Sequence, residues 1–204
     1  MGLSMLRVKD QNAQKQSKKY VTSEEYLALE ETAEYKSEYH QGDTFTMAGG
    51  SSNHNIIVSN INGQMALAFK AKDCVSYMLD MRLWIEANGL FTYPDLFVVC
   101  GKREFYQSRK DTITNPSLIM EVLSDSTENY DRGNKFVLYR SIPTLREYIM
   151  IDQYKFHLEQ FSLGQDGKWN LTEYNGPNSI LHCSTIDFQI PLREIYNKVE
   201  FESE

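Results

Sequence analysis

The sequence lacks the features of a membrane-spanning, secreted or polybasic protein. The 204 residues contain no run of 18 or more apolar side chains, so we expect no membrane-spanning helix. With 21 Lys plus Arg against 28 Asp plus Glu, the net charge is -7, which argues against a histone-like nucleic-acid binder. The first twenty residues have no apolar stretch for a signal peptide, although they hold several bases: Arg7, Lys9, Lys15, Lys18 and Lys19.

Cysteine is scarce and its spacing is uninformative. Cys74, Cys100 and Cys183 are odd in number and far apart in the chain, which suits buried thiols in a reducing cytoplasm better than a disulfide framework or a zinc site. Three histidines, His40, His157 and His182, show no metal-ligand spacing. The chain has no P-loop, no dinucleotide-binding fingerprint and no internal repeat. We therefore expect a cytoplasmic protein without a nucleotide cofactor.

Composition and length fit one folded domain. Hydrophobic residues make up 41% of the chain and charged residues 24%, which is ordinary globular usage. We expect residues 1–20 to form a flexible basic arm and residues 21–204 to form a single domain.

Local patterns predict a mixture of helices and hairpins. Thr22 and Glu25 have the spacing of a capping box, which predicts a short helix. Residues 35–47 alternate around Gln41-Gly42-Asp43 and predict a hairpin. Apolar residues recur at three- and four-residue spacing over residues 54–72, which indicates an amphipathic helix.

The rest of the chain is predicted to be rich in strands. Residues 75–85 and 90–100 flank an Asn-Gly turn, a strong hairpin signal. Residues 117–123 have the length and character of a buried strand, and a helix is expected after residues 124–129, up to Arg140. Further strands are expected at 145–151, 155–161, 169–174 and 180–183, and a last helix from Pro191. The fold class is α+β, with a central mixed, mostly antiparallel sheet flanked by helices.

Two carboxylates interrupt apolar strands. Asp95 follows Tyr93-Pro94 and precedes an apolar run, and Glu121 lies inside Leu118–Leu123. A lone buried carboxylate costs several kcal/mol, so such a group is normally paired, protonated or bound to a metal. If the two strands are neighbours, both acids can bind one divalent cation, and oxygen ligands favour Mg²⁺ or Mn²⁺. Alternatively, each acid lies at a strand end and faces water.

A lysine on the next predicted helix is the third candidate. Asp131, Lys135 and Tyr139 are spaced i, i+4 and i+8, so they share one helical face. Lys135 can pair with Asp131 as a routine surface ion pair. It can also reach the two carboxylates, where an ammonium group would orient a water molecule and stabilise charge on a phosphoryl oxygen.

An ordered set of motifs makes the chain resemble a known family. The motifs are Tyr93-Pro94-Asp95, Glu121-Val122-Leu123-Ser124, Ser126-Thr127, Asp131 and residues 133–139, followed by Pro143, residues 145–148 and Ile151-Asp152; earlier matches are Tyr26-Leu27, Glu38-Tyr39, Gly42 and residues 52–55. Over about residues 20–200 the chain resembles the Uma-two family of restriction-endonuclease-like proteins in the PD-(D/E)XK nuclease superfamily. The resemblance implies a restriction-endonuclease-like core.

The resemblance also implies roles for individual residues. Asp95 and Glu121 would be metal ligands, joined by the backbone carbonyl of Val122. The usual lysine two residues after the glutamate is replaced by Leu123, and the resemblance implies that Lys135 has taken its role. Glu38 matches an acidic position near the metal; its alternative is a solvated acid.

His54 opens the long predicted helix and can approach the same cleft. The alternative is a purely structural histidine, which is the commoner role of a lone histidine.

The charge is uneven along the chain. Residues 101–146 hold eight bases and six acids, whereas residues 22–60 hold seven acids and one base. A duplex needs cations along its phosphate path rather than a basic protein overall. The candidates for these contacts lie in one loop: Lys102, Arg103, Arg109 and Lys110. The alternative is a solvated charged loop.

The leading hypothesis is a Mg²⁺- or Mn²⁺-dependent endonuclease that hydrolyses DNA phosphodiester bonds without a covalent intermediate, using Asp95, Glu121, Lys135 and Glu38. Superfamily members that cut duplexes often pair two active sites, so a homodimer is expected. The alternative is a nuclease-fold module that binds nucleic acid or protein without cutting. A small-molecule hydrolase with the same metal site is a third possibility.

Overall fold

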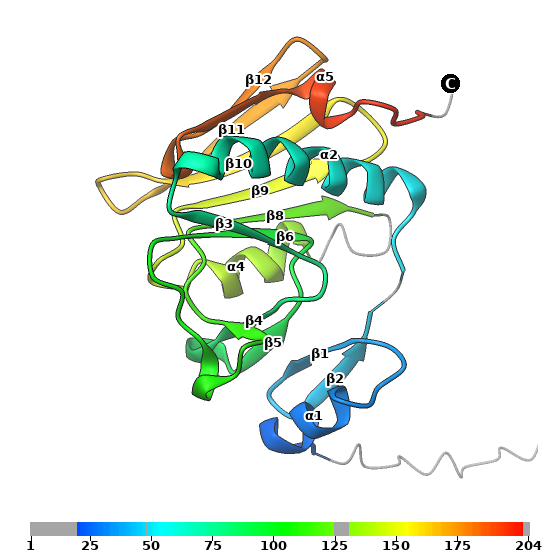
Figure 1. Ribbon diagram of the computed structural model, residues 1–204, viewed down its shortest axis with the longest axis vertical. Coiled ribbons are helices and arrows are strands. Elements are labelled where there is room, and N and C mark those ends of the chain that lie inside the picture. Colours follow the sequence, from blue (N-terminus) through cyan, green and yellow to red (C-terminus); the bar gives the residue numbers. More distant parts are fainter. Residues whose placement is uncertain (1–19, 48, 125–130, 202–204) are drawn as a thin grey trace, which may run out of the picture.

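The computed structural model describes residues 20–47, 49–124 and 131–201 (Figure 1). The predicted basic arm, apart from Tyr20, lies outside the described residues, as does most of the segment 124–129. The predictions of a flexible arm and of a single domain over residues 21–204 therefore stay predictions.

The N-terminal elements form as their local sequence predicts. Helix α1 (Ser23–Glu30) begins with the predicted capping box: the Thr22 hydroxyl accepts a hydrogen bond from the Glu25 amide, and the Glu25 carboxylate accepts one from the Thr22 amide. Strands β1 (Ser37–His40) and β2 (Asp43–Thr46) form the predicted hairpin. Its turn places both Gln41 and Gly42 at positive φ, which glycine adopts without strain.

The long predicted hairpin forms, but each of its arms is broken. The outer strands β3 (Cys74–Met78) and β6 (Leu96–Cys100) pair with each other in one sheet, and the inner strands β4 (Arg82–Ile85) and β5 (Leu90–Thr92) pair in another. The second arm breaks at Tyr93-Pro94-Asp95, where proline has no amide hydrogen to donate to a ladder. Asp95 is thereby placed directly before β6.

Most of the strands belong to two mixed sheets. The larger sheet has the order β11-β10-β9-β8-β6-β3, and the smaller has the order β2-β1-β5-β4-β7. Only the β8–β9 and β4–β7 pairs are parallel among those described, so the mostly antiparallel character is confirmed. The division into two sheets was not predicted. The remaining strands are β7 (Thr112–Ile113), β8 (Leu118–Leu123), β9 (Glu147–Asp152), β10 (His157–Leu163), β11 (Trp169–Asn175), and the separate hairpin β12 (Ile180–Cys183) with β13 (Phe188–Pro191).

Helices cover both faces of the six-stranded sheet (Figure 1). Helix α2 (Ser52–Ala68), α5 (Leu192–Ile195) and the β12–β13 hairpin pack on one face, around Ile57, Ile61 and Met120. On the other face lie α4 (Phe136–Tyr139), the π-helical turn η4 (Asp131–Lys135) before it, and β4 and β5 of the smaller sheet. Short 3-10 helices complete the fold: η1 (Phe69–Ala71), η2 (Glu86–Asn88), η3 (Tyr106–Ser108) and η5 (Ser184–Ile186).

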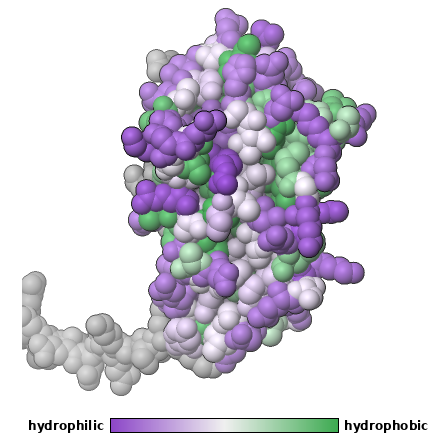
Figure 2. Space-filling model, turned by 90° about the vertical axis from the view of Figure 1, so that its left-hand side faces the viewer, coloured by the Kyte–Doolittle hydropathy of each residue, from purple (hydrophilic) through white to green (hydrophobic). Residues whose placement is uncertain are grey.

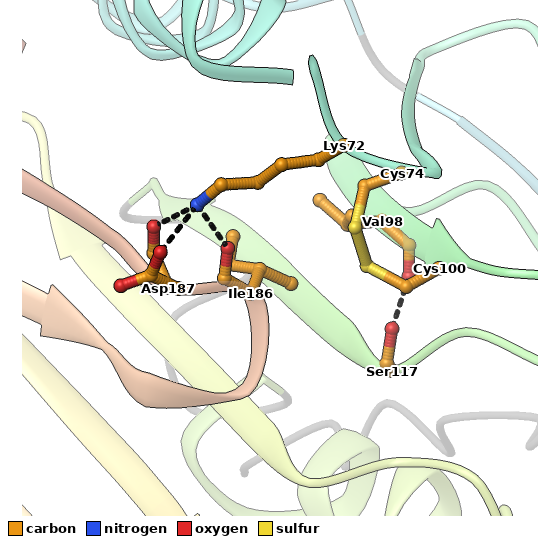
Figure 3. Close-up of a disulfide and its surroundings, with 7 residues drawn as sticks. All are labelled: Lys72, Cys74, Val98, Cys100, Ser117, Ile186 and Asp187. Carbon is orange, nitrogen blue, oxygen red and sulfur yellow. Dashed lines mark hydrogen bonds and ion pairs between the residues drawn. A yellow bond between two sulfur atoms is a disulfide. The ribbon is translucent and has the colours of Figure 1, made fainter. Parts of the chain in front are cut away.

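The prediction of separate thiols is wrong for two of the three cysteines. Cys74 and Cys100 form a disulfide that joins edge strand β3 to β6 (Figure 3). They are direct partners across the antiparallel pair, with Cα atoms 4.0 Å apart, which brings their side chains together. Their separation of 26 residues hid this pairing, because only the folded hairpin places them opposite each other. Cys183 is a buried thiol, as predicted, and burial raises its pKa.

The surface carries mixed polarity. On the face shown in Figure 2, hydrophilic side chains predominate and hydrophobic residues form small patches between them. Within the described ranges, none of the helices has the length and apolar character needed to cross a bilayer.

Candidate active site

Asp95 and Glu121 are braced against each other across two adjacent strands. Strands β6 and β8 are antiparallel neighbours, with Leu96 opposite Met120. The Asp95 amide donates a hydrogen bond of 3.2 Å to Oε2 of Glu121, and the Val122 amide donates one of 2.8 Å to Oδ2 of Asp95. Each acid is thus held by the backbone beside the other acid, and the carboxylates lie next to each other. The alternative of two separate, water-facing strand ends does not hold.

Lys135 reaches this pair from η4. Its Nζ lies 3.0 Å from Oε1 of Glu121 and 3.3 Å from Oδ1 of Asp131, and the side chains of all three residues are at least nine-tenths buried. Lys135 therefore contacts both Asp131 and Glu121. Because all three side chains are buried, the routine surface ion pair does not hold.

Tyr139 adds a hydroxyl group to the same carboxylate. Its hydroxyl donates a hydrogen bond of 2.7 Å to Oε1 of Glu121, and its ring is fully buried. The i, i+4, i+8 spacing placed Tyr139 on the face of Lys135, but sequence reasoning gave it no role. The hydroxyl of a buried tyrosine usually needs a hydrogen-bond partner. The acid inside the apolar strand, Glu121, was therefore the sequence feature that could have indicated this contact.

Glu38 comes from the other sheet. Its Oε1 lies 3.7 Å from Nζ of Lys135 and accepts a hydrogen bond from the Thr92 hydroxyl, and its side chain is 13% exposed. Strand β1, which carries Glu38, pairs with β5, which carries Thr92. Glu38 is therefore part of the cluster rather than a solvated acid.

His54 closes the cluster from the opposite side. It lies in the first turn of α2, whose N-cap Ser51 accepts a hydrogen bond from the His54 amide. Its Nε2 lies 3.0 Å from Oδ2 of Asp95. The sequence left open whether His54 approaches the carboxylates or is purely structural, and the structure brings it into contact with Asp95.

Burial and the charge of the partner shift the pKa values of Glu121 and Lys135 in opposite directions. Burial raises the pKa of Glu121 to about 8; the charge of Lys135 opposes this rise, and the charges of Asp95 and Asp131 add to it. Burial alone would lower the pKa of Lys135, yet this pKa lies well above its usual value because of the surrounding acids, Glu121 foremost. We conclude that Lys135 is held as an ammonium ion among carboxylates.

The donor set suits a hard divalent cation. Two carboxylates from adjacent strands lie side by side, and carboxylate oxygens are ligands that Mg²⁺ and Mn²⁺ prefer. A cation beside Glu121 would also favour the ionised carboxylate that burial disfavours. Asp95 and Glu121 would hold it, together with the backbone carbonyl of Val122.

The predicted basic loop divides into two parts. Lys102, Arg103 and Lys110 line an open pocket of about 630 Å³. Arg109 instead makes two 2.9 Å hydrogen bonds to Asp111, which raise the pKa of its guanidinium group. The pocket adjoins Gly101, at the far end of β6 from Asp95, and therefore lies about 16 Å along the strand from the carboxylates.

The fold thus holds a buried cluster of two adjacent carboxylates and a lysine. Comparison with known proteins shows the family. A family model named Uma2, with the description "Putative restriction endonuclease", matches residues 23–193. The chain belongs to this family, the Uma-two family named above. This membership supports nuclease function at a general level.

Two relatives from Synechocystis sp. are similar over most of the chain. The "Uncharacterized protein sll1609" is 39% identical over 81% of this chain and 94% of its own length. The "Uncharacterized protein slr1290" is 33% identical over 89% of this chain and 94% of its own length. Neither name states an activity.

A solved structure supports the fold. It comes from Anabaena variabilis and is described as "a putative nuclease belonging to DUF820". It superposes with a TM-score of 0.69, covering 85% of this chain and 96% of that one, at 13% identity. At this identity the likeness concerns the fold, which is the predicted restriction-endonuclease-like α+β class.

Proposed function

We propose that this protein is a Mg²⁺- or Mn²⁺-dependent endonuclease that hydrolyses phosphodiester bonds in DNA. The observation that carries the proposal is the convergence of Asp95, Glu121 and Lys135, from three separate elements, within hydrogen-bonding distance of one another or of a shared partner. Membership of a family described as restriction endonucleases supports the same reaction class.

Each side chain of the cluster has its own role in the proposed hydrolysis. Asp95 and Glu121 would hold the cation, and its chemistry there would be to activate a water molecule and to stabilise charge on the scissile phosphate. Lys135, 3.0 Å from Glu121, is close enough to hold a water molecule or a phosphate oxygen beside that carboxylate. Tyr139 fixes the orientation of Glu121, and Glu38 helps to hold the Lys135 ammonium in place.

The DNA path in this proposal includes the basic pocket. Lys102, Arg103 and Lys110 would contact phosphates away from the scissile bond, about 16 Å along β6 from Asp95. Arg109 contributes less, because Asp111 and Glu31 already compensate its charge. The proposal includes a homodimer, since cutting both strands of a duplex uses two active sites.

The test is a nicking assay on supercoiled plasmid with Mg²⁺ or Mn²⁺, comparing wild type with D95N, E121Q and K135M. Each substitution should lower the cleavage rate by at least about a hundredfold, since each removes a cation ligand or a positioned charge. The matched controls are D166N and K168M, because Asp166 and Lys168 form an exposed ion pair away from the cluster. These controls should cut at the wild-type rate.

The outcomes separate the proposal from its rival. Cleavage that survives D95N, E121Q and K135M would place the activity elsewhere. Wild-type protein that binds plasmid without cutting it would favour the nuclease-fold binding module. Accumulation of linear product before full nicking would support paired active sites.

A further inference from the structure

A second group of metal ligands lies on the edge of the six-stranded sheet. His157 and Glu159 are two residues apart on β10, and Glu173 lies opposite Glu159 on edge strand β11. One ligand atom from each of the three residues lies within 4.8 Å of the other two. No residue of this group belongs to the candidate active site.

Strand geometry makes these residues share a face. Side chains alternate along a strand, so Leu158 and Gln160 are buried on one side of the sheet, and His157, Glu159 and Phe161 lie on the other. Phe161 stacks on Phe136 of α4, with ring centroids 4.2 Å apart, which identifies this side as the α4 face.

The group lies on the same face as Glu121. Glu121 pairs with Met150, Met150 with Glu159, and Glu159 with Glu173, so the three acids form one row across four strands. Glu121 and Glu159 are two strands apart, which separates their backbones by about 9.5 Å. The group is therefore a neighbour of the candidate active site and not part of it.

A hydrogen bond orients the histidine. Nδ1 of His157 lies 2.8 Å from the side-chain oxygen of Asn175, the cross-strand partner of His157. With Nδ1 held by Asn175, the other ring nitrogen, Nε2, faces Oε1 of Glu159 at a distance of 3.3 Å. Metal-binding histidines are commonly oriented in this way.

We propose that His157, Glu159 and Glu173 bind a divalent transition-metal ion of the Zn²⁺ class. One imidazole nitrogen and two carboxylates suit Zn²⁺, which takes His and Glu ligands at about 2.0–2.2 Å and leaves a fourth position for water. The ligand atoms have to draw together slightly, and the exposed Glu173 side chain has the freedom to do so. Opposed like charges weaken a strand pair, and the ion reverses that effect between Glu159 and Glu173.

Binding of the ion would cross-link the edge strand β11 to β10. β11 pairs only with β10 among the described strands, and the ion would tie the two together near the active-site end. Zn²⁺ at a hundredfold excess over its Kd should therefore raise the Tm of the EDTA-treated protein by about 5–10 °C.

The test is isothermal titration with Zn²⁺, with thermal unfolding and the visible absorption of bound Co²⁺ as further readouts. H157A, E159Q and E173Q should each weaken Zn²⁺ binding at least about tenfold, and N175A should weaken it through the lost orientation of His157. The matched control is H182A, which removes an exposed histidine of β12 and should leave binding unchanged. E173Q alters an exposed side chain, so its folding is not at risk.

A separate variant keeps this proposal distinct from the proposed nuclease. E121Q removes a ligand of the active-site cation but should keep the Zn²⁺ affinity of the β10–β11 site. Zn²⁺ binding that disappears in E121Q and persists in H157A and E173Q would overturn the proposal, as would a wild-type protein that binds no Zn²⁺.

Discussion

Removing the positive charge of Lys135 should destabilise the fold strongly. The change K135M keeps a side chain of similar length but leaves Glu121, 3% exposed, without its ammonium partner. Breaking a buried ion pair by deleting one partner costs about 3–5 kcal/mol, because the remaining acids either stay buried without a counter-charge or have to take up a proton. Asp131 and Glu38 also lose a compensating charge at 3.3 and 3.7 Å, so we expect a cost of at least about 3 kcal/mol.

The assay is urea and thermal unfolding followed by circular dichroism, without added metal. A loss of about 3 kcal/mol corresponds to a Tm lower by roughly 6–12 °C for a chain of this size. The double variant K135M/E121Q should recover part of the loss, because it removes the stranded carboxylate together with its partner. The exposed Lys168 provides the control, and K168M should change stability by less than about 0.5 kcal/mol.

Two outcomes would refute this reasoning. If K135M unfolds like K168M, Lys135 is solvated and the buried cluster does not exist as described. If the double variant is less stable than K135M by the full cost of E121Q alone, the two side chains are not coupled.

Two further predictions concern other parts of the fold. Burial raises the pKa of Glu147, so the pKa in the folded state lies above that in the unfolded state. The free energy of unfolding should therefore fall as pH rises from the unfolded pKa through the folded pKa. E147Q should thus gain stability relative to wild type between pH 4 and pH 8, measured as Tm; an equal difference at both pH values would contradict this cause. Reducing the Cys74–Cys100 disulfide, which closes a loop of about 26 residues, should cost about 3 kcal/mol and lower Tm by roughly 6–12 °C. C183A should keep this sensitivity to reductant and C74A/C100A should lose it, whereas a wild-type Tm that reductant leaves unchanged would disprove the disulfide.

Most of the helices and hairpins could be predicted from short stretches of sequence. The capping box of Thr22 and Glu25, the helix around Ile57 and the strand around Glu121 depend on residues within a few positions of one another. Pro94 favours a break in the second arm locally, but the sheet that each side of the break joins depends on pairing partners elsewhere in the chain. The hairpin was therefore predicted without its division between two sheets.

The candidate site was predictable in part for a related reason. A carboxylate inside an apolar strand is a local anomaly, and Asp95 and Glu121 could be recognised as such. The contacts of Lys135 and Glu38 required the packing of η4 and of the second sheet against β8. The hydrogen bond from Tyr139 to Glu121 had only the spacing of one helical face as its signal.

The sequence by itself determined the periodicity, the caps and turns, and the acids that packing alone would not place in strands, since these features depend on near neighbours in the chain. Only the tertiary structure decided which distant residues meet: Cys74 with Cys100, Lys135 with Glu121, and His157 with Glu173. These contacts depend on strand order and register. Burial of the apolar side chains on the two faces of the six-stranded sheet, rather than any local preference, selects that register. The net charge of -7 illustrates the difference, because its sum is fixed by composition while the acids that can hold a cation are chosen by the fold.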